Sequence, residues 1–190
     1  MNFIDLKLDY SNTHREIIEG AKENNRFAQY QLYQLYAKSM YNTCYRMMNN
    51  KEEAEDLLQD SFSEAFLKIK FFRYESSFGA WLKQIVINKC INAIKKKSIE
   101  VNYFEDYGSI DEKDEKEDIF EDVDLEVERI RRAIEKLPNG FRIIISLYLL
   151  EGYDHKEISS ILDISESTSK TQYIRAKKKI REILKTPYHE

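Results

Sequence analysis

The chain has 190 residues, with 34 acidic and 30 basic side chains and a formal net charge of −4. This length suits one ordinary domain or two small ones. The chain has only 5 glycines and 2 prolines, which argues against sandwiches, barrels and doubly wound folds because these need frequent turn residues. We therefore expect an all-α protein.

The N-terminus and the apolar segments give no sign of export. The opening residues Met-Asn-Phe-Ile-Asp include no basic residue, and Ser146 and Tyr148 interrupt the longest apolar stretch, 143–150. We expect no signal peptide, no membrane insertion and a cytoplasmic location. Cys44 and Cys90 lack the close spacing of a zinc or redox motif, so we expect reduced thiols on apolar helix faces.

Capping patterns and apolar periodicity predict four helices in the first half of the chain. Thr13-His-Arg-Glu16 and Asn50-Lys-Glu-Glu53 have the spacing of a capping box, at which helices begin. The predicted spans are 14–24, 27–48, 51–70 and 77–97. The third helix has a core stripe made of Ala54, Leu58, Phe62, Ala65 and Ile69. Its opposite side includes no cation and consists of Glu52, Glu53, Asp56, Gln59, Asp60 and Glu64.

Aromatic residues and cations alternate after the third helix. The aromatics are Phe71, Phe72, Tyr74, Phe78 and Trp81, with Lys68, Lys70, Arg73 and Lys83 among them. Stacking of aromatics on unpaired bases, beside cations that hold the backbone, is typical of single-strand binding. Several of the five are expected in the core instead, as most aromatics are. The next helix has an outward stripe of Trp81, Gln84, Asn88, Asn92 and Lys95, in which amides can read bases.

Charge is distributed unevenly along the chain. Residues 100–128 hold 14 acidic side chains and two lysines, a net of −12, so the other 161 residues carry +8. We predict an acidic linker over 99–122 between two domains, 1–98 (core about 20–98) and 123–190. Basic side chains cluster in 76–99 and 166–181, a pattern expected of nucleic-acid binding, although a run of charge is more often a solvated helix face.

The second domain is predicted to contain four helices that include a helix-turn-helix. An apolar stripe over 123–137 ends at Pro138-Asn139-Gly140, and a very apolar, buried helix follows over 141–150 and ends at Gly152. Asp154-His-Lys-Glu157 caps a short helix, which a three-residue turn separates from a basic helix over 166–184. In a helix-turn-helix the second helix enters the major groove. Its inward side comprises Ser169, Tyr173, Ala176, Ile180 and Leu184, and its outward side Lys170, Thr171, Ile174, Arg175 and Lys178.

Two sets of motifs resemble the domains of bacterial extracytoplasmic-function (group 4) sigma-70 factors. Three motifs resemble the sigma-2 domain: Ala54-Glu-Asp-Leu-Leu-Gln-Asp-Ser-Phe62, Phe72-Arg-Tyr-Glu-Ser-Ser-Phe78 and Trp81-Leu-Lys-Gln-Ile-Val-Ile-Asn88. Three further motifs resemble the sigma-4 domain: Leu137-Pro138, Glu151-Gly-Tyr-Asp-His-Lys-Glu-Ile158 and Ser167-Thr-Ser-Lys-Thr-Gln-Tyr-Ile-Arg-Ala-Lys-Lys-Lys179. The sets follow the order of the family around a linker and cover about 20–98 and 123–185.

The resemblance implies a factor that binds core RNA polymerase and directs it to promoter DNA, without catalysis, cofactor or metal of its own, and with an anti-sigma factor as a further partner. It places the polymerase contacts on Asp56, Gln59 and Asp60. It places minus-10 recognition and melting on Arg73, Tyr74, Glu75, Ser76, Ser77, Trp81, Gln84, Asn88, Lys89 and Asn92. It places minus-35 recognition on Lys170, Thr171, Ile174, Arg175 and Lys178.

Two positions depart from the family pattern. Gln84 stands where an arginine is common, which bears on minus-10 preference. Asp163 stands where the turn often has glycine, although aspartate tolerates the left-handed conformation better than most residues.

Two other classes of protein compete with this interpretation. A helix-turn-helix regulator of the two-component output type would explain 123–185 equally well, but it leaves the acidic helix side and the aromatic cluster unused. A metal-dependent nuclease would use the many carboxylates. However, Asp111-Glu-Lys-Asp-Glu-Lys-Glu-Asp118 lacks the glycine turn of a calcium loop, and His14, His155 and His189 have no ligand spacing. Binding to purified core polymerase separates the first alternative from the sigma-factor interpretation.

Overall fold

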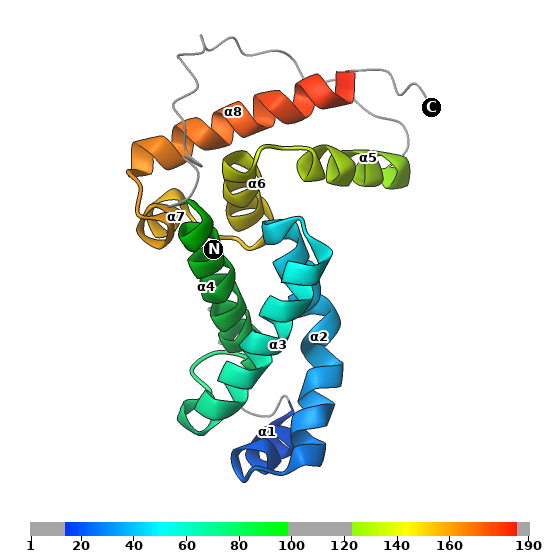
Figure 1. Ribbon diagram of the computed structural model, residues 1–190, viewed down its shortest axis with the longest axis vertical. Helices are drawn as coiled ribbons and strands as arrows, with labels where there is room; N and C mark the ends of the chain where they lie inside the picture. Colours follow the sequence, from blue (N-terminus) through cyan, green and yellow to red (C-terminus); the bar gives the residue numbers. More distant parts are fainter. Residues whose placement is uncertain (1–13, 99–122, 186–190) are drawn as a thin grey trace, which may run out of the picture. The chain divides into compact units, whose positions relative to one another are not determined.

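The computed structural model describes residues 14–98 and 123–185, and within these ranges every regular element is helical (Figure 1). The elements are α1 (Arg15–Lys22), α2 (Arg26–Met48), α3 (Lys51–Lys68), the 3-10 turn η1 (Ile69–Phe71), α4 (Phe78–Ser98), α5 (Val123–Glu135), α6 (Asn139–Ile145), the π-helical turn η2 (Ser146–Leu150), α7 (His155–Leu162) and α8 (Glu166–Lys185). The predicted all-α fold is confirmed.

The chain divides into two compact units, residues 1–93 (unit 1) and 94–190 (unit 2). The predicted linker, 99–122, lies outside the described residues, so the expected domain boundaries at 98 and 123 stay a prediction. None of the helices in the described ranges has the length and apolar character needed to span a bilayer.

Unit 1 is built around α2, which packs against α1 and α3. The Asn25 side chain caps α2, accepting from the backbone N–H groups of Phe27 at 2.9 Å and Ala28 at 3.2 Å. Asn50 caps α3 as predicted, with its Oδ1 3.1 Å from Glu53 N. All five residues of the predicted α3 stripe are buried, and so are Leu82, Val86 and Cys90 of α4.

The predicted cap of the first helix is wrong. The helix begins at Arg15, one residue later than a Thr13 cap requires, and Thr13 itself lies outside the described residues. His14 occupies the N-cap position with a left-handed φ of 58° and makes no side-chain capping bond. Its Nδ1 instead lies 3.1 Å from the Tyr36 hydroxyl, so a contact with α2 replaces the local cap.

Unit 2 places α8 against α5, α6 and α7. Leu137, Ile145 and Ala176 form a buried cluster that partly buried apolar side chains surround, namely Ile134, Phe141, Tyr173, Ile180 and Ile183. Of the predicted inward side of the last helix, Ser169 and Ala176 are buried, and Tyr173 and Ile180 pack against this cluster. Leu184 is half-buried, and it is Ile183 that packs against the cluster at that end.

The apolar helix predicted over 141–150 differs from the observed segment. It begins two residues earlier, at Asn139, and changes to a π-helical turn at Ser146. Leu149 and Leu150 are 53% and 46% exposed, so the prediction that the segment is buried as far as residue 150 is wrong. The wider turn, with Glu151 N bonded to Ser146 O at 3.0 Å, ends the helix before the chain reaches Gly152 at φ 80°.

Candidate nucleic-acid interface

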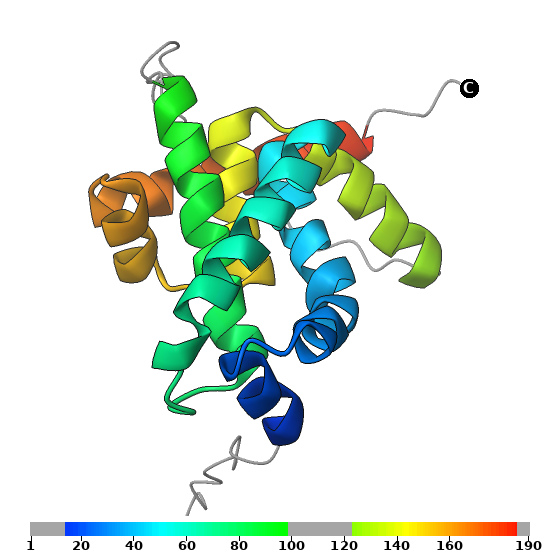
Figure 2. The same cartoon turned by 60° about the horizontal axis from the view of Figure 1, so that its bottom comes forward.

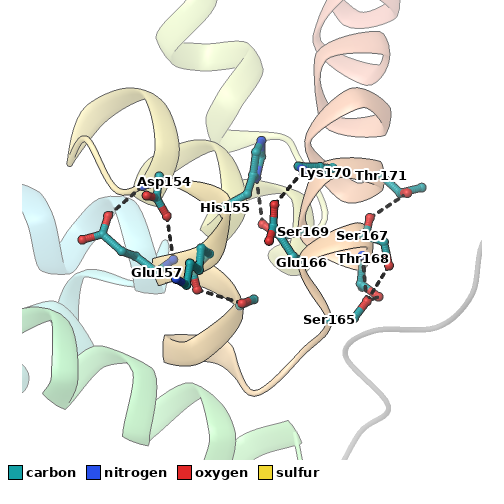
Figure 3. Close-up of polar contacts among 12 residues, drawn as sticks. Asp154, His155, Glu157, Ser165, Glu166, Ser167, Thr168, Ser169, Lys170 and Thr171 are labelled. Atoms are coloured by element: carbon teal, nitrogen blue, oxygen red, sulfur yellow. Dashed lines mark hydrogen bonds and ion pairs between the residues drawn. The ribbon is translucent and has the colours of Figure 1, made fainter.

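Side-chain caps set the helix-turn-helix of unit 2 (Figure 3). Asp154 Oδ1 accepts from Glu157 N at 2.7 Å, and Glu157 Oε2 accepts from Asp154 N at 2.8 Å, so the predicted capping box is formed. The short helix α7 ends at Asp163, which has a left-handed φ of 59° and ψ of 48°. The turn therefore forms without glycine, in the conformation that aspartate tolerates.

The basic helix α8 begins at a cluster of hydroxyl groups. Ser165 Oγ accepts from Thr168 N at 3.0 Å and lies 2.8 Å from the hydroxyls of both Ser167 and Thr168. This is the N-cap arrangement, which satisfies a backbone donor that the helix leaves unpaired. In the first turn Glu166 pairs with Lys170 at 2.6 Å, and this hydrogen bond lowers the pKa of Glu166.

A partly buried polar contact fixes the rotation of α8. The Ser169 hydroxyl, which is inaccessible to solvent, lies 2.9 Å from His155 Nδ1 (Figure 3). The His155 ring stacks on Tyr148 with centroids 4.5 Å apart and meets the Tyr173 ring edge-on at 5.6 Å. Because α7 and η2 thus hold this side of α8, the opposite side is turned toward solvent.

The residues predicted to read duplex DNA share that outer side, which we call the recognition face: Lys170, Thr171, Ile174, Arg175 and Lys178. All are exposed except Arg175, which is half-buried. Ile174 is 50% exposed and lies between cations. Exposure of its apolar side chain to water does not stabilise the free protein. Apolar contact with a thymine methyl and cation contact with phosphate are both available to this set.

On α4 the predicted amides Gln84, Asn88 and Asn92 form an exposed stripe at intervals of four residues, here called the amide stripe. Gln84 Nε2 donates to Asn88 Oδ1 at 3.4 Å. Trp81 at the start of the stripe is half-buried, because its ring packs on Phe72 at 5.3 Å and on Phe78 at 5.5 Å. The stripe thus combines exposed amides with an indole that also belongs to the core.

The five aromatics of the cluster differ in exposure. Phe72 and Phe78 are buried, with 4% and 3% of their surfaces exposed. Phe71, by contrast, is 77% exposed at the end of η1. Of the five, Phe71 therefore offers most of its ring to a stacking partner, although it was not among the predicted contact residues.

The loop of residues 73–77, called the minus-10 loop below, has an unusual conformation at its second residue. Tyr74 is left-handed, with φ 61°, and its hydroxyl donates to Glu19 Oε1 at 2.7 Å. Burial, and then this hydrogen bond, raise the pKa of Tyr74 to about 12. Arg73 and Glu75 are exposed, Ser76 is half-buried, and the Ser77 hydroxyl accepts from Ala80 N at 3.2 Å at the start of α4.

The predicted polymerase contacts Asp56, Gln59 and Asp60 are exposed on α3 opposite its buried stripe, and we call them the acidic face. The prediction that this side of the helix lacks a cation is wrong at Glu64. Its carboxylate lies 2.6 Å from Lys68 Nζ and 2.9 Å from Lys89 Nζ. The two lysines lower the pKa of Glu64, and the hydrogen bond with Glu64 raises the pKa of Lys89.

The cysteines are buried and free of disulfide bonds, as expected for reduced thiols. Although 46 residues apart in sequence, their side chains hydrogen-bond to each other, which lowers the pKa of Cys44. Over the described residues, no three His, Cys, Asp or Glu side chains group in a way that could hold a metal ion.

Comparison with known proteins identifies both halves of the chain. Residues 32–99 match the family model described as Sigma-70 region 2, and residues 127–180 match the one described as Sigma-70, region 4. The ECF RNA polymerase sigma factor SigW of Bacillus subtilis is 29% identical over an alignment of 177 residues that covers 88% of this chain and 95% of that protein. SigM of the same bacterium is 29% identical over 153 residues, covering 80% of this chain and 91% of that protein.

Two solved structures share the fold. The sigma factor RpoE from Bartonella quintana, solved in complex with the anti-sigma factor NepR, matches with a TM-score of 0.52 and 24% identity over 83% of this chain and 97% of that one. CnrH, solved in complex with the cytosolic domain of CnrY, matches with a TM-score of 0.51 and 21% identity over 90% of this chain and 96% of that one.

Proposed function

The chain belongs to the extracytoplasmic-function sigma-70 family, and we propose from this premise that it binds core RNA polymerase and directs promoter-specific initiation of transcription. The observation that carries the proposal is the presence, in one chain, of both family regions with most of their candidate contact residues exposed. A lone helix-turn-helix regulator would account for region 4 but would leave region 2 without a role.

We propose that the recognition face of α8 reads the minus-35 element as duplex DNA. In a helix-turn-helix the second helix lies in the major groove and its exposed side chains meet the base edges. Lys170 and Lys178 supply cations for phosphates or guanines, and Ile174 supplies an apolar surface for a thymine methyl. The contact between His155 and Ser169 supports this role, because it holds α8 in one rotation at its N-terminal end.

We propose that the minus-10 loop, the amide stripe and Lys89 capture the unpaired minus-10 strand. Exposed amides can bond to base edges, and an aromatic ring can stack on a base that has left the duplex. Trp81 contributes through its exposed part, and Phe71 is added to the set because its ring is 77% exposed. The exposed Arg73 supplies a cation for the backbone of the strand.

The acidic face of α3 is proposed to dock on core polymerase. Its carboxylates carry negative charge on a helix face that makes no contribution to the buried stripe, which suits a basic partner. An anti-sigma factor is proposed as a second protein partner. This partner is suggested by the solved structure of RpoE, which shares the fold and holds the anti-sigma factor NepR.

Run-off transcription tests the proposed function. Core polymerase of Bacillus subtilis would be combined with the full chain and a duplex pool with a randomised upstream region, and the transcribed templates would be sequenced. We expect transcription that depends on the chain, and enrichment of two short elements separated by a fixed spacer. Binding of the chain to duplex DNA, with no transcription above that of core enzyme alone, would favour the simple regulator.

A further inference from the structure

The minus-10 loop is held from outside by α1, a helix that precedes the part of the chain matched by region 2. The Tyr74 hydroxyl donates to Glu19 Oε1 at 2.7 Å, and Lys22 Nζ lies 3.0 Å from the same carboxylate oxygen. In Figure 2, α1 (dark blue) lies beside the turn that follows α3, in agreement with the contacts between α1 and η1. The contact joins residues 55 positions apart.

The Tyr74 ring is enclosed on several sides. It packs against the buried ring of Phe72, with centroids 4.8 Å apart. Lys22 Nζ lies 4.6 Å from the Tyr74 centroid and Arg15 Cζ lies 5.2 Å from it, both within the range of a cation–π interaction. Three side chains of α1 therefore contact this residue, and its ring is joined to the core of unit 1.

The backbone of Tyr74 explains why such an enclosure matters. With φ at 61°, Tyr74 is in the left-handed region, which is unfavourable for a bulky residue because Cβ approaches the following carbonyl. Such a conformation persists only where the surroundings hold it, and strained residues of this kind gather at functional sites. Arg73 and Glu75, the exposed neighbours on either side, take their direction from this residue.

We propose that Glu19 is a positioning residue for minus-10 recognition: it holds Tyr74 in the left-handed conformation and so fixes the shape in which the minus-10 loop receives unpaired DNA. The inference rests on the proposed function of that loop and revises the role of one residue in it. Tyr74 shapes the loop, while Arg73 and Glu75 remain the residues exposed to the strand.

Two variants of the full chain change the contact with little change in volume. Glu19→Gln takes away the negative charge of the acceptor, and Tyr74→Phe takes away the donor hydroxyl. Glu23→Gln is the matched control, because Glu23 is exposed at the C-cap of the same helix. The first measurement is amide exchange of residues 73–77 without polymerase. The second uses holoenzyme on a promoter selected by the wild type, and follows duplex binding and strand opening separately.

Both variants are expected to exchange faster in the loop and to open the promoter about three- to tenfold more slowly, the size of effect typical of one hydrogen bond. Duplex binding and the melting temperature should stay close to wild type, and Glu23→Gln should match wild type throughout. Loop exchange or opening that is unchanged in the folded variants would overturn the proposal.

A rescue separates positioning from simple stability. Glycine adopts a positive φ without steric cost, so Tyr74→Gly in the Glu19→Gln background should open the promoter faster than Glu19→Gln alone. If Glu19 acted only through the stability of unit 1, removing the ring would lower the opening rate further, and that result would overturn the proposal. Failure of the wild type to support any transcription would refute the proposed function instead, and amide exchange would still decide whether Glu19 holds the loop.

Discussion

Lys89 of α4 and Glu64 of α3 form an ion pair of 2.9 Å that links the two sides of unit 1 assigned to different partners. Glu64 lies on the same side of α3 as the acidic face, and Lys89 lies beside the amide stripe. Lys89 is therefore already neutralised in part when DNA arrives. A DNA phosphate has to compete with the Glu64 carboxylate for this cation.

This competition predicts opposite effects for two variants. Glu64→Gln should strengthen holoenzyme binding to a minus-10 oligonucleotide and steepen its salt dependence, whereas Lys89→Ala should weaken binding and make the salt dependence shallower. The log–log slopes of the two variants should differ by about 0.7, the value for one phosphate contact on a single strand. The double variant should behave as Lys89→Ala alone, since Glu64 acts through the lysine. Additive effects in the double variant would contradict the assignment of Lys89 to DNA.

The acidic face predicts a loss of polymerase binding without a loss of fold. Asp56→Lys together with Asp60→Lys should weaken core binding at least tenfold, because two attractive charges become repulsive. Both side chains are exposed opposite the buried stripe, so the free energy of unfolding should change by less than about 0.5 kcal/mol per substitution. Glu55→Lys is the control for a single substitution, since it makes the same charge change as Asp56→Lys about 100° around the helix. Equal core affinity in the double variant and the control would contradict the docking assignment.

Phe71 and Phe78 provide a direct contrast between an aromatic that is available to DNA and one that is structural. Phe71 is 77% exposed, so Phe71→Ala should leave the free energy of unfolding within about 0.5 kcal/mol of wild type. The same variant should slow promoter opening, because a ring that can stack on an unpaired base is lost. Phe78→Ala should destabilise unit 1 by about 3–5 kcal/mol, because that ring is buried against Phe72 and Trp81. The single tryptophan, Trp81, packs on Phe78, so its fluorescence reports the unfolding of unit 1. Normal opening by Phe71→Ala would remove Phe71 from the site.

Local patterns in the sequence predicted what is decided locally. The Asn50 cap and the Asp154 capping box are contacts over three residues, and both were predicted correctly. The buried stripe of α3 and the inward side of α8 follow from a period of 3.6 residues, which is also local. The burial of Phe72 and the exposure of Phe71 depend on how η1 meets its neighbours, so the sequence left that choice open.

Contacts between distant residues account for what was missed. Glu19 and Tyr74 are 55 residues apart, so nothing in either local pattern connects α1 to the minus-10 loop. Lys89 reaches Glu64 from another helix, which is why the acidic side of α3 was taken to lack cations. Cap prediction also fails where a tertiary contact replaces the local one, as at His14 and Tyr36.

The turn before α8 predicts a stability difference at Asp163. Its φ of 59° is a conformation that glycine adopts without steric cost and that alanine does not. Asp163→Ala should therefore destabilise unit 2 by about 1–2 kcal/mol. Asp163→Gly should be close to neutral or stabilising, because relief of the strain opposes the added entropy of the unfolded chain. Amide exchange in α7 and α8 measures both. A greater loss for glycine than for alanine would mean that the Asp163 side chain, and not its backbone, holds the turn.

The recognition face and the amide stripe should respond differently to the state of the DNA. Lys170→Ala should weaken recruitment to a closed duplex promoter by about 1–3 kcal/mol if a bidentate base contact is lost. A premelted template should not restore that loss, because the missing contact lies in the upstream duplex. Lys179→Ala is the control on the same helix. Lys179 lies about 100° around the helix from Lys178, and its Nζ pairs with Glu182 at 3.0 Å.

Asn88→Ala should have the reverse pattern. Asn88 is exposed on the amide stripe and makes no contribution to the core, so duplex recruitment and the fold should be retained. Strand opening should be slower, because an amide that bonds to an unpaired base stabilises only the melted state. A premelted bubble should then restore part of the transcription, since the cost of opening has been removed from the reaction. If a folded Asn88→Ala variant opens promoters at the normal rate, or a Lys170→Ala variant is recruited normally, the two surfaces have been assigned to the wrong states of the DNA.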